Sequence, residues 1–154
     1  MIAAVAAATI AVGLSACSPT EPTEPAPTAA DPSATPSAPS QTGPAYIADG
    51  SAADNLPLFS TVTAQVWSSE SRSSGRAYID ALTSAGFDRA AMQVTQDTTT
   101  VGNPAESLQF SVRWGETECL VGQVGPSTGE PVTTVLPQLA EGRCLVGATR
   151  AIDW

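Results

Sequence analysis

The run Ser107-Leu108-Gln109-Phe110-Ser111-Val112-Arg113-Trp114 alternates polar and apolar residues from end to end. Successive side chains of a strand point to opposite faces of a sheet, so this run predicts a β-strand with one buried and one solvated face. Gly115 and Glu116 predict a tight turn into a second strand over residues 117–124. The same period of two at residues 92–97 predicts a strand before the first one. Together the three segments predict an antiparallel meander.

Two helices are expected before the meander. The first should begin behind an N-cap at Asp54 or Asn55. The second should be capped by Ser73 or Ser74 and should end at Gly86, in a left-handed conformation that glycine adopts easily. The apolar residues that recur at helical spacing are Leu56, Phe59, Val62 and Val66 in the first helix, and Tyr78, Ile79, Leu82 and Ala85 in the second.

Two further elements are expected after the meander. Apolar residues return to helical spacing within residues 132–139, and Pro137 limits this stretch to a short helix. Residues 142–149 predict a last strand. The predicted fold is a small single α+β domain, with two N-terminal helices packed on a four-stranded, mainly antiparallel sheet.

The first residues predict export and lipid attachment. An uncharged apolar run at residues 2–12 has the length of an export-signal core and is shorter than the roughly 20 residues that span a bilayer. Leu14-Ser15-Ala16-Cys17 then follows the order that a lipoprotein signal peptidase recognises. We therefore expect a signal peptide at residues 1–16 and a diacylglycerol on the thiol of Cys17. The alternatives are an ordinary cleaved signal with a chance cysteine, or a short membrane helix.

Residues 17–53 are expected to form the lipidated cysteine and a disordered tether, with the globular domain at residues 54–154. Eight of the thirteen prolines lie between Pro19 and Pro44, in a segment too poor in apolar residues to collapse. The whole chain carries a formal net charge of −9, which disfavours binding to nucleic acid. We expect the protein on the outer, extracytoplasmic face of the cell membrane, held by its lipid.

The three cysteines fit this location. Cys17 is assigned to lipid, and an exported chain meets an oxidising environment, so Cys119 and Cys144 are expected to form a disulfide. The alternative is two separate buried thiols. The sequence Cys-Leu-Val-Gly occurs at residues 119–122 and again at residues 144–147. Two such strands lying side by side in one sheet would bring the two sulfur atoms within bonding distance.

Several short runs resemble an actinobacterial lipoprotein family of unknown function. These runs are Gly75-Arg76-Ala77-Tyr78, Asn103-Pro104-Ala105-Glu106-Ser107, Phe110-Ser111-Val112-Arg113-Trp114-Gly115, Cys144-Leu145-Val146-Gly147, and Arg150 with Ile152-Asp153-Trp154. The resemblance covers roughly residues 55–154. It implies a lipid-anchored, exported domain with paired cysteines, and it implies no activity, substrate or catalytic residue.

Composition excludes several kinds of catalytic site. The chain has no histidine and all six of its basic residues are arginine, which removes histidine-based triads, the serine–lysine dyad and most zinc sites. Glu116 and Glu118 are two residues apart and would share a face of a strand, where a carboxylate pair could serve a hydrolase or bind calcium. The alternative is a charged strand edge that deters aggregation. We expect no enzymatic activity, no catalytic residue, no cofactor and no metal.

The polar residues with the best prospects for binding are Arg113, Arg150, Asp153 and Trp154. The planar guanidinium of an arginine can hold a carboxylate, and a tryptophan beside it can present an aromatic face. These residues would form a small groove for a peptide or a glycan. In the structural alternative, Trp154 fills the core and Arg150 pairs with Asp153 or a terminal carboxylate. Trp67 and Trp114 are expected to be core residues.

These observations predict a lipid-anchored cell-envelope protein that acts as a non-catalytic binding or interaction module. Its partners would be the membrane, through the lipid, and an envelope protein or glycan. One alternative is a glycan hydrolase that uses carboxylates alone, which needs two acids in one cleft with the pKa of one of them raised. Another is an accessory or inhibitor subunit of an exported enzyme, which would expose an apolar patch.

Overall fold

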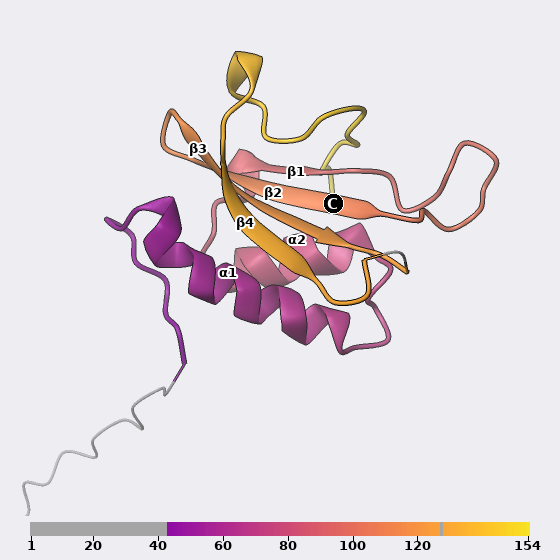
Figure 1. Ribbon diagram of the computed structural model, residues 1–154, viewed down its shortest axis with the longest axis horizontal. Coiled ribbons are helices and arrows are strands. Elements are labelled where there is room, and N and C mark those ends of the chain that lie inside the picture. Colours follow the sequence, from indigo (N-terminus) through magenta and orange to yellow (C-terminus); the bar gives the residue numbers. More distant parts are fainter. Residues whose placement is uncertain (1–42, 127) are drawn as a thin grey trace, which may run out of the picture. The chain divides into compact units, whose positions relative to one another are not determined.

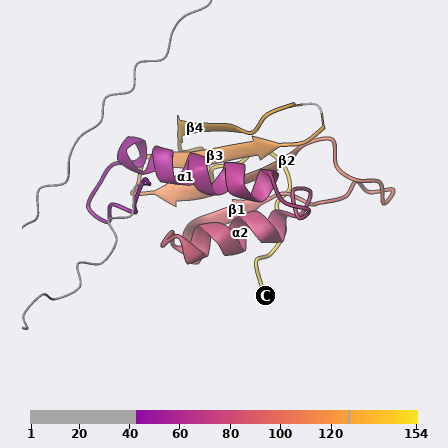
Figure 2. The same cartoon turned by 90° about the horizontal axis from the view of Figure 1, so that it is seen from below.

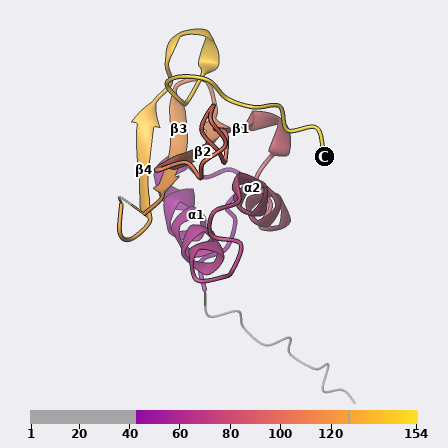
Figure 3. The same cartoon turned by 90° about the vertical axis from the view of Figure 1, so that its right-hand side faces the viewer.

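The computed structural model describes residues 43–126 and 128–154 (Figure 1). The predicted signal peptide, Cys17 and the tether up to residue 42 lie outside the described residues. Within them, the strands form one antiparallel sheet in the order β1-β2-β3-β4, and both long helices cover one of its faces (Figure 3). In chain order the elements are α1 (Ala52–Trp67), α2 (Gly75–Ser84), η1 (Arg89–Ala91), β1 (Met92–Val94), β2 (Leu108–Trp114), β3 (Glu118–Val124), β4 (Val132–Pro137) and η2 (Ala140–Gly142). The predicted α+β class, with two helices on a four-stranded sheet and one disulfide, is confirmed.

Helix α1 begins earlier than its expected cap. Ser51 is the N-cap: its hydroxyl accepts a hydrogen bond from the backbone N–H of Asp54, and the carboxylate of Asp54 accepts one from the N–H of Ser51. The expectation of a cap at Asp54 or Asn55 was wrong, because Asp54 is the third helical residue of this reciprocal capping box. Asn55 is buried instead, and its amide bonds both the N–H and the C=O of Ile47.

Helix α2 ends as the sequence indicates. Gly86 adopts a φ of 106°, and the N–H of Phe87 donates back to the carbonyl of Leu82. This left-handed residue lets the chain reverse, so that Phe87 is buried in the core. In Figure 2, which views the molecule from below, α1 and α2 lie side by side in front of the sheet.

The core lies between the helices and the inner face of the sheet. The inner face predicted for β2 is confirmed: Leu108, Phe110 and Val112 are buried there. The expectation of a solvated outer face was wrong at Ser111, which is fully buried opposite Val121 on the face that the loop of Cys144 covers. The ring of Tyr78, from α2, stacks on that of Phe110 with centroids 4.4 Å apart. Opposite Phe110 on β3 stands Gly122, where a Cβ atom would lie 2.4 Å from the phenyl ring. The glycine therefore makes room for the phenyl ring of Phe110.

Residues 132–137 form a strand, β4, and not the short helix expected from their spacing. Val132-Thr133-Thr134-Val135 is rich in β-branched residues, which favour strands. The inner positions of β4 face α1: Val135 packs against the core, and the hydroxyl of Thr133 lies 2.7 Å from that of Ser60. In so short a run, the same apolar residues fit both the spacing of a helix and the alternation of a strand. Hydrogen bonding to β3 decides in favour of the strand.

The last expected strand, residues 142–149, is instead a loop that folds over the outer face of the sheet. Glu141, Gly142 and Gly147 all have positive φ, which interrupts an extended conformation. Cys144 bonds to Cys119 with their Cα atoms 5.7 Å apart, so the predicted disulfide is confirmed. The expected geometry was wrong, because Cys119 lies on β3 but Cys144 lies in a loop and not in a neighbouring strand.

Candidate functional site

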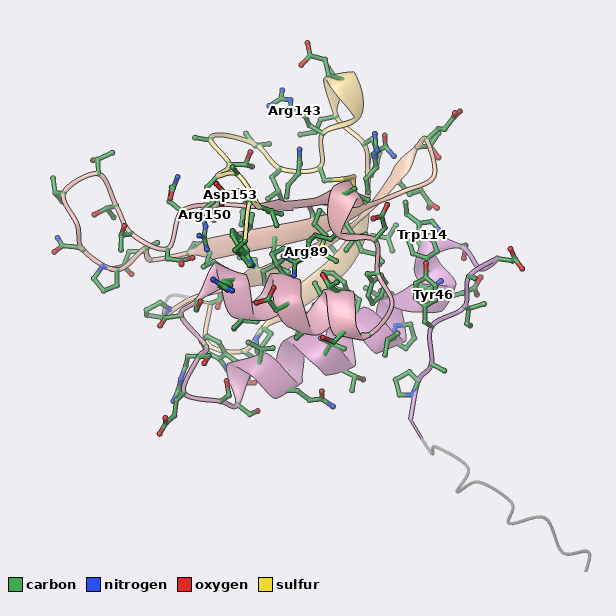
Figure 4. All side chains as sticks on the ribbon, turned by 180° about the vertical axis from the view of Figure 1, so that it is seen from behind. Tyr46, Arg89, Trp114, Arg143, Arg150 and Asp153 are labelled. Carbon is green, nitrogen blue, oxygen red and sulfur yellow. A yellow bond between two sulfur atoms is a disulfide. The ribbon has the colours of Figure 1, made fainter. Side chains whose placement is uncertain are left out.

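The side chain of Trp154 is surrounded by arginines, in what we call the Trp154 cluster. The guanidinium carbons of Arg76, Arg89 and Arg150 lie 5.5, 6.0 and 4.9 Å from the indole centroid, within the range of cation–π attraction. The indole N–H donates to Asp80 of α2 over 3.0 Å, and Arg89 donates to the backbone carbonyl of Trp154 over 2.9 Å. Figure 4 shows Arg89 and Arg150 beside α2. The cluster therefore attaches the last described residues to α2.

Asp80 balances the positive charge of this cluster. Burial acts to raise the pKa of its carboxyl, but hydrogen bonds from Trp154, Arg89 and Arg76 outweigh burial and lower it. The ionised carboxylate is thus stabilised by folding. That contribution is present above the unfolded pKa of about 3.9 and is lost as the pH falls through the lower folded value.

Arg150 connects the Trp154 cluster to β1 and to the segment that follows it. Its Nη2 atom donates to both carboxylate oxygens of Asp97, over 3.2 and 3.0 Å, and its backbone N–H bonds the carbonyl of Val94. Asp97 also accepts from the N–H of Gly75 over 2.9 Å. The alternative in which Arg150 pairs with Asp153 is therefore wrong. Trp154 packs against the core but stays partly exposed.

The structure does not gather the other predicted binding residues at this place. Arg113 lies exposed on the outer face of the sheet, next to Gly142, and Asp153 is exposed beyond Arg150. Glu116 stands in the turn before β3, so it does not share a strand with Glu118. Of the four residues proposed for a groove, Arg150 and Trp154 are the pair whose side chains are in contact.

A cavity of about 360 Å³ opens beside Trp67 at the end of α1. We call it the Trp67 cavity. Its polar wall carries Arg72, from the connection between the helices, and Asp97, from the connection between β1 and β2. Its apolar wall is formed by Trp67, Pro104, Ala105, Leu108, Val124 and Pro126. The volume falls within the range of about 300–1,000 Å³ that is typical of small-molecule sites.

The two charged residues of the cavity differ in how they are paired. The charge of Asp97 is already matched by Arg150. Arg72 is exposed, forms no ion pair with a described residue, and lies with its guanidinium carbon 5.8 Å from the Trp67 ring. The buried hydroxyl of Tyr78 donates to the backbone carbonyl of Arg72 over 2.8 Å and so positions it. The mouth of the cavity therefore offers one unmatched positive charge beside an aromatic surface.

Sequence reasoning treated Trp67 as a core residue and did not single out Arg72 or Asp97. Trp67 ends α1, whereas Arg72 and Asp97 stand in two different connections, so no common spacing marks the three. A helix that ends in a tryptophan, followed by a polar break that contains the only arginine between the helices, is the signal that was available.

A family described as a domain of unknown function (DUF6993) matches residues 63–148. The chain belongs to this family. The matched range contains every residue that lines the Trp67 cavity, and both cysteines of the disulfide, whereas Arg150 and Trp154 lie beyond it. Neither a curated protein nor a solved structure matches the chain.

Two properties of the described residues also bear on the site. None of their helices combines the length and apolar character needed to cross a membrane. They contain no group of three or more acidic or cysteine side chains arranged to hold a metal ion.

Proposed function

We propose that this protein is a lipid-anchored module of the cell envelope that binds a small amphipathic ligand, without catalysis, in the Trp67 cavity. The ligand would have an apolar body that fills the cavity and an anionic group that meets Arg72. The observation that carries this proposal is a cavity of about 360 Å³ with a mainly apolar lining and an unmatched guanidinium at its mouth.

The anchor is supported by the sequence Leu14-Ser15-Ala16-Cys17 and by the proline-rich segment after it. The disulfide between Cys119 and Cys144 is consistent with an oxidising compartment outside the cytoplasm. A tether of this composition would carry the domain, with its cavity, away from the membrane surface.

The ligand class follows from the two walls of the cavity. Burial of apolar surface against Leu108, Val124 and Trp67 would supply most of the affinity, at about 25 cal/mol for each Å² removed from water. Arg72 would orient the ligand through a charge-assisted hydrogen bond, which is stronger for an anion than for a neutral group. The pairing of Asp97 with Arg150 removes a free negative charge that would otherwise repel an anion.

Two dyes with the same aromatic frame test this proposal. Anilinonaphthalene sulfonate carries an anionic group and phenylnaphthylamine does not, and the fluorescence of both rises in an apolar site. We expect both to bind the full chain with a stoichiometry of one. Arg72→Gln should weaken binding of the sulfonate dye by about tenfold, because one charge-assisted hydrogen bond is lost. It should leave the affinity for the neutral dye unchanged.

Matched variants control for the rest of the surface. Ala105→Trp places a large side chain in the cavity and should abolish binding of both dyes, whereas Ala140→Trp makes the same change on η2, away from the cavity. Arg143→Gln removes an exposed arginine that does not line the cavity. Equal effects of the Arg72 and Arg143 substitutions, or dye binding that survives Ala105→Trp in a folded chain, would remove the proposed site.

A further inference from the structure

The outer edge of β4 has no strand beyond it among the described residues (Figures 2 and 3). Its other edge pairs with β3. Gln138 follows the last residue of β4, and its N–H donates to the carbonyl of Thr117 over 2.8 Å, which continues the register of that pair. In an antiparallel pair, alternate residues direct both backbone groups at the neighbouring strand. The backbone groups that face β3 are therefore those of Val132, Thr134 and Leu136, and those that face solvent are those of Thr133, Val135 and Pro137.

The free edge is symmetric about Thr134. Thr133 and Val135 stand on either side of it and each presents an unpaired N–H to solvent. Pro131 and Pro137 stand three residues away on either side and have no N–H to offer. Over residues 131–137, only Thr133 and Val135 can therefore donate backbone hydrogen bonds to an added strand.

The side chains on the outer face of β4 are apolar and exposed. Val132 is 54% exposed and Leu136 is 44% exposed, with Thr134 between them. No charged residue occurs from residue 131 to residue 137, although charges are a usual protection of an open edge. The strand thus combines free backbone N–H groups with uncovered apolar side chains. At this edge the carbonyl of Val135 accepts only a local bond, from the hydroxyl of Thr134 over 3.3 Å.

We propose that a second copy of this chain pairs with β4, antiparallel, about a two-fold axis through Thr134. In this register Thr133 faces the partner's Val135 and Val135 faces the partner's Thr133, which makes four backbone hydrogen bonds in a dimer whose sheet is continuous. On the outer face, Val132 covers the partner's Leu136, and Leu136 covers the partner's Val132. Thr134 lies against its own copy, an arrangement that stabilises antiparallel pairs.

The sequence of β4 favours this register and a second copy as the occupant. A shift of two residues in one direction would set Leu136 against the partner's Glu130, and a shift in the other would set Val132 against the partner's Gln138. In the symmetric register Glu130 faces Gln138, so no two acidic residues are opposed. The same alignment covers both apolar side chains with apolar side chains of the partner, which a strand of unrelated sequence would do only by chance.

Cysteine cross-linking tests the dimer and its register in one experiment. The test uses the full chain in detergent with Cys17→Ser, which removes the one thiol outside the disulfide. The Cα atoms of the two Thr134 residues would lie about 4.5–5.5 Å apart, a distance that a disulfide spans. Thr134→Cys should therefore cross-link to a covalent dimer on mild oxidation. Val132→Cys is the matched control, because its two copies would be roughly 13 Å apart along the strands.

A second variant tests the association without a cross-link. Thr134→Lys places two like charges across the axis and should weaken dimerisation by at least about tenfold in sedimentation velocity. Thr100→Lys makes the same change in an exposed loop and should leave the dimer intact. A chain that stays monomeric at every concentration overturns the proposal, even if β4 takes up a peptide from another protein. Equal cross-linking of the Thr134 and Val132 variants overturns it too.

Discussion

At the scale of single residues, Tyr78 connects the core to the candidate site. Its ring is fully buried against Phe110, and its hydroxyl holds the carbonyl of Arg72 at the mouth of the Trp67 cavity. Burial raises the pKa of Tyr78 to about 12, and the positive charge of Arg72 acts in the opposite direction with less effect. The folded chain therefore retains this proton at a pH where the unfolded chain loses it. Stability is complete below the unfolded pKa of about 10 and falls as the pH rises toward 12.

Substitution of this tyrosine tests both roles. Tyr78→Phe should lower the free energy of unfolding by about 1 kcal/mol near neutral pH, because the Arg72 carbonyl loses its donor. It should also flatten the decline in stability between about pH 10 and pH 12. Urea titrations at several pH values measure both effects. Tyr46→Phe, at an exposed tyrosine, is the control and should keep the decline; identical profiles for the two variants would contradict this account.

At the scale of elements, the disulfide holds a loop against the outer face of the sheet. Cys144 and Leu145 are buried against Cys119 and Val121, while Val146 of the same loop is 78% exposed. The amide oxygen of Gln93, on β1, accepts hydrogen bonds from the N–H groups of Cys144 and Leu145 over 2.8 and 3.2 Å. The covalent bond thus closes a segment that contains β4 and η2 and fixes both ends of it to the sheet.

Removal of the disulfide should loosen this segment before it affects the helices. A Cys119→Ala, Cys144→Ala double variant should lose up to about 3–4 kcal/mol of stability, the chain-entropy value for a loop of this length. Hydrogen exchange should increase in residues 143–149 and change little in α2. Val146→Ala alters the same loop, keeps the disulfide and should behave as wild type. Unfolding of α2 at the same rate as the loop would show that the loop is part of the core.

At the scale of the whole molecule, the proposed location depends on lipidation of Cys17, which lies outside the described residues. A lipid on its thiol would carry an acidic chain, with a net charge of −9, to a membrane that would otherwise repel it. We predict that cells fed a labelled fatty acid incorporate the label into this protein, and that Cys17→Ser abolishes incorporation and moves the chain out of the membrane fraction. The Cys119→Ala, Cys144→Ala variant should remain labelled. Labelling that survives Cys17→Ser would disprove the anchor.

The sequence alone was sufficient to predict those features that depend only on residues close together in the chain. The faces of β2 follow from alternation, since each side chain's direction is set by its position in the strand. The left-handed end of α2 at Gly86 follows from the absence of a Cβ atom. The disulfide was predicted from the number of cysteines and from the expected export, although its geometry was not.

Only the tertiary structure decided the rest, because distant hydrogen bonds and packing overrule a short local pattern. Residues 132–137 satisfy a helical and a strand period, and the open edge of β3 made them a strand. Trp67, Arg72 and Asp97 have no common spacing, and they meet because the ends of α1, β2 and β3 converge. Arg113 and Arg150 were grouped in one predicted groove, yet they lie apart. Arg113 is exposed on the outer face of β2, whereas Arg150 bonds the carbonyl of Val94 on β1 and the carboxylate of Asp97.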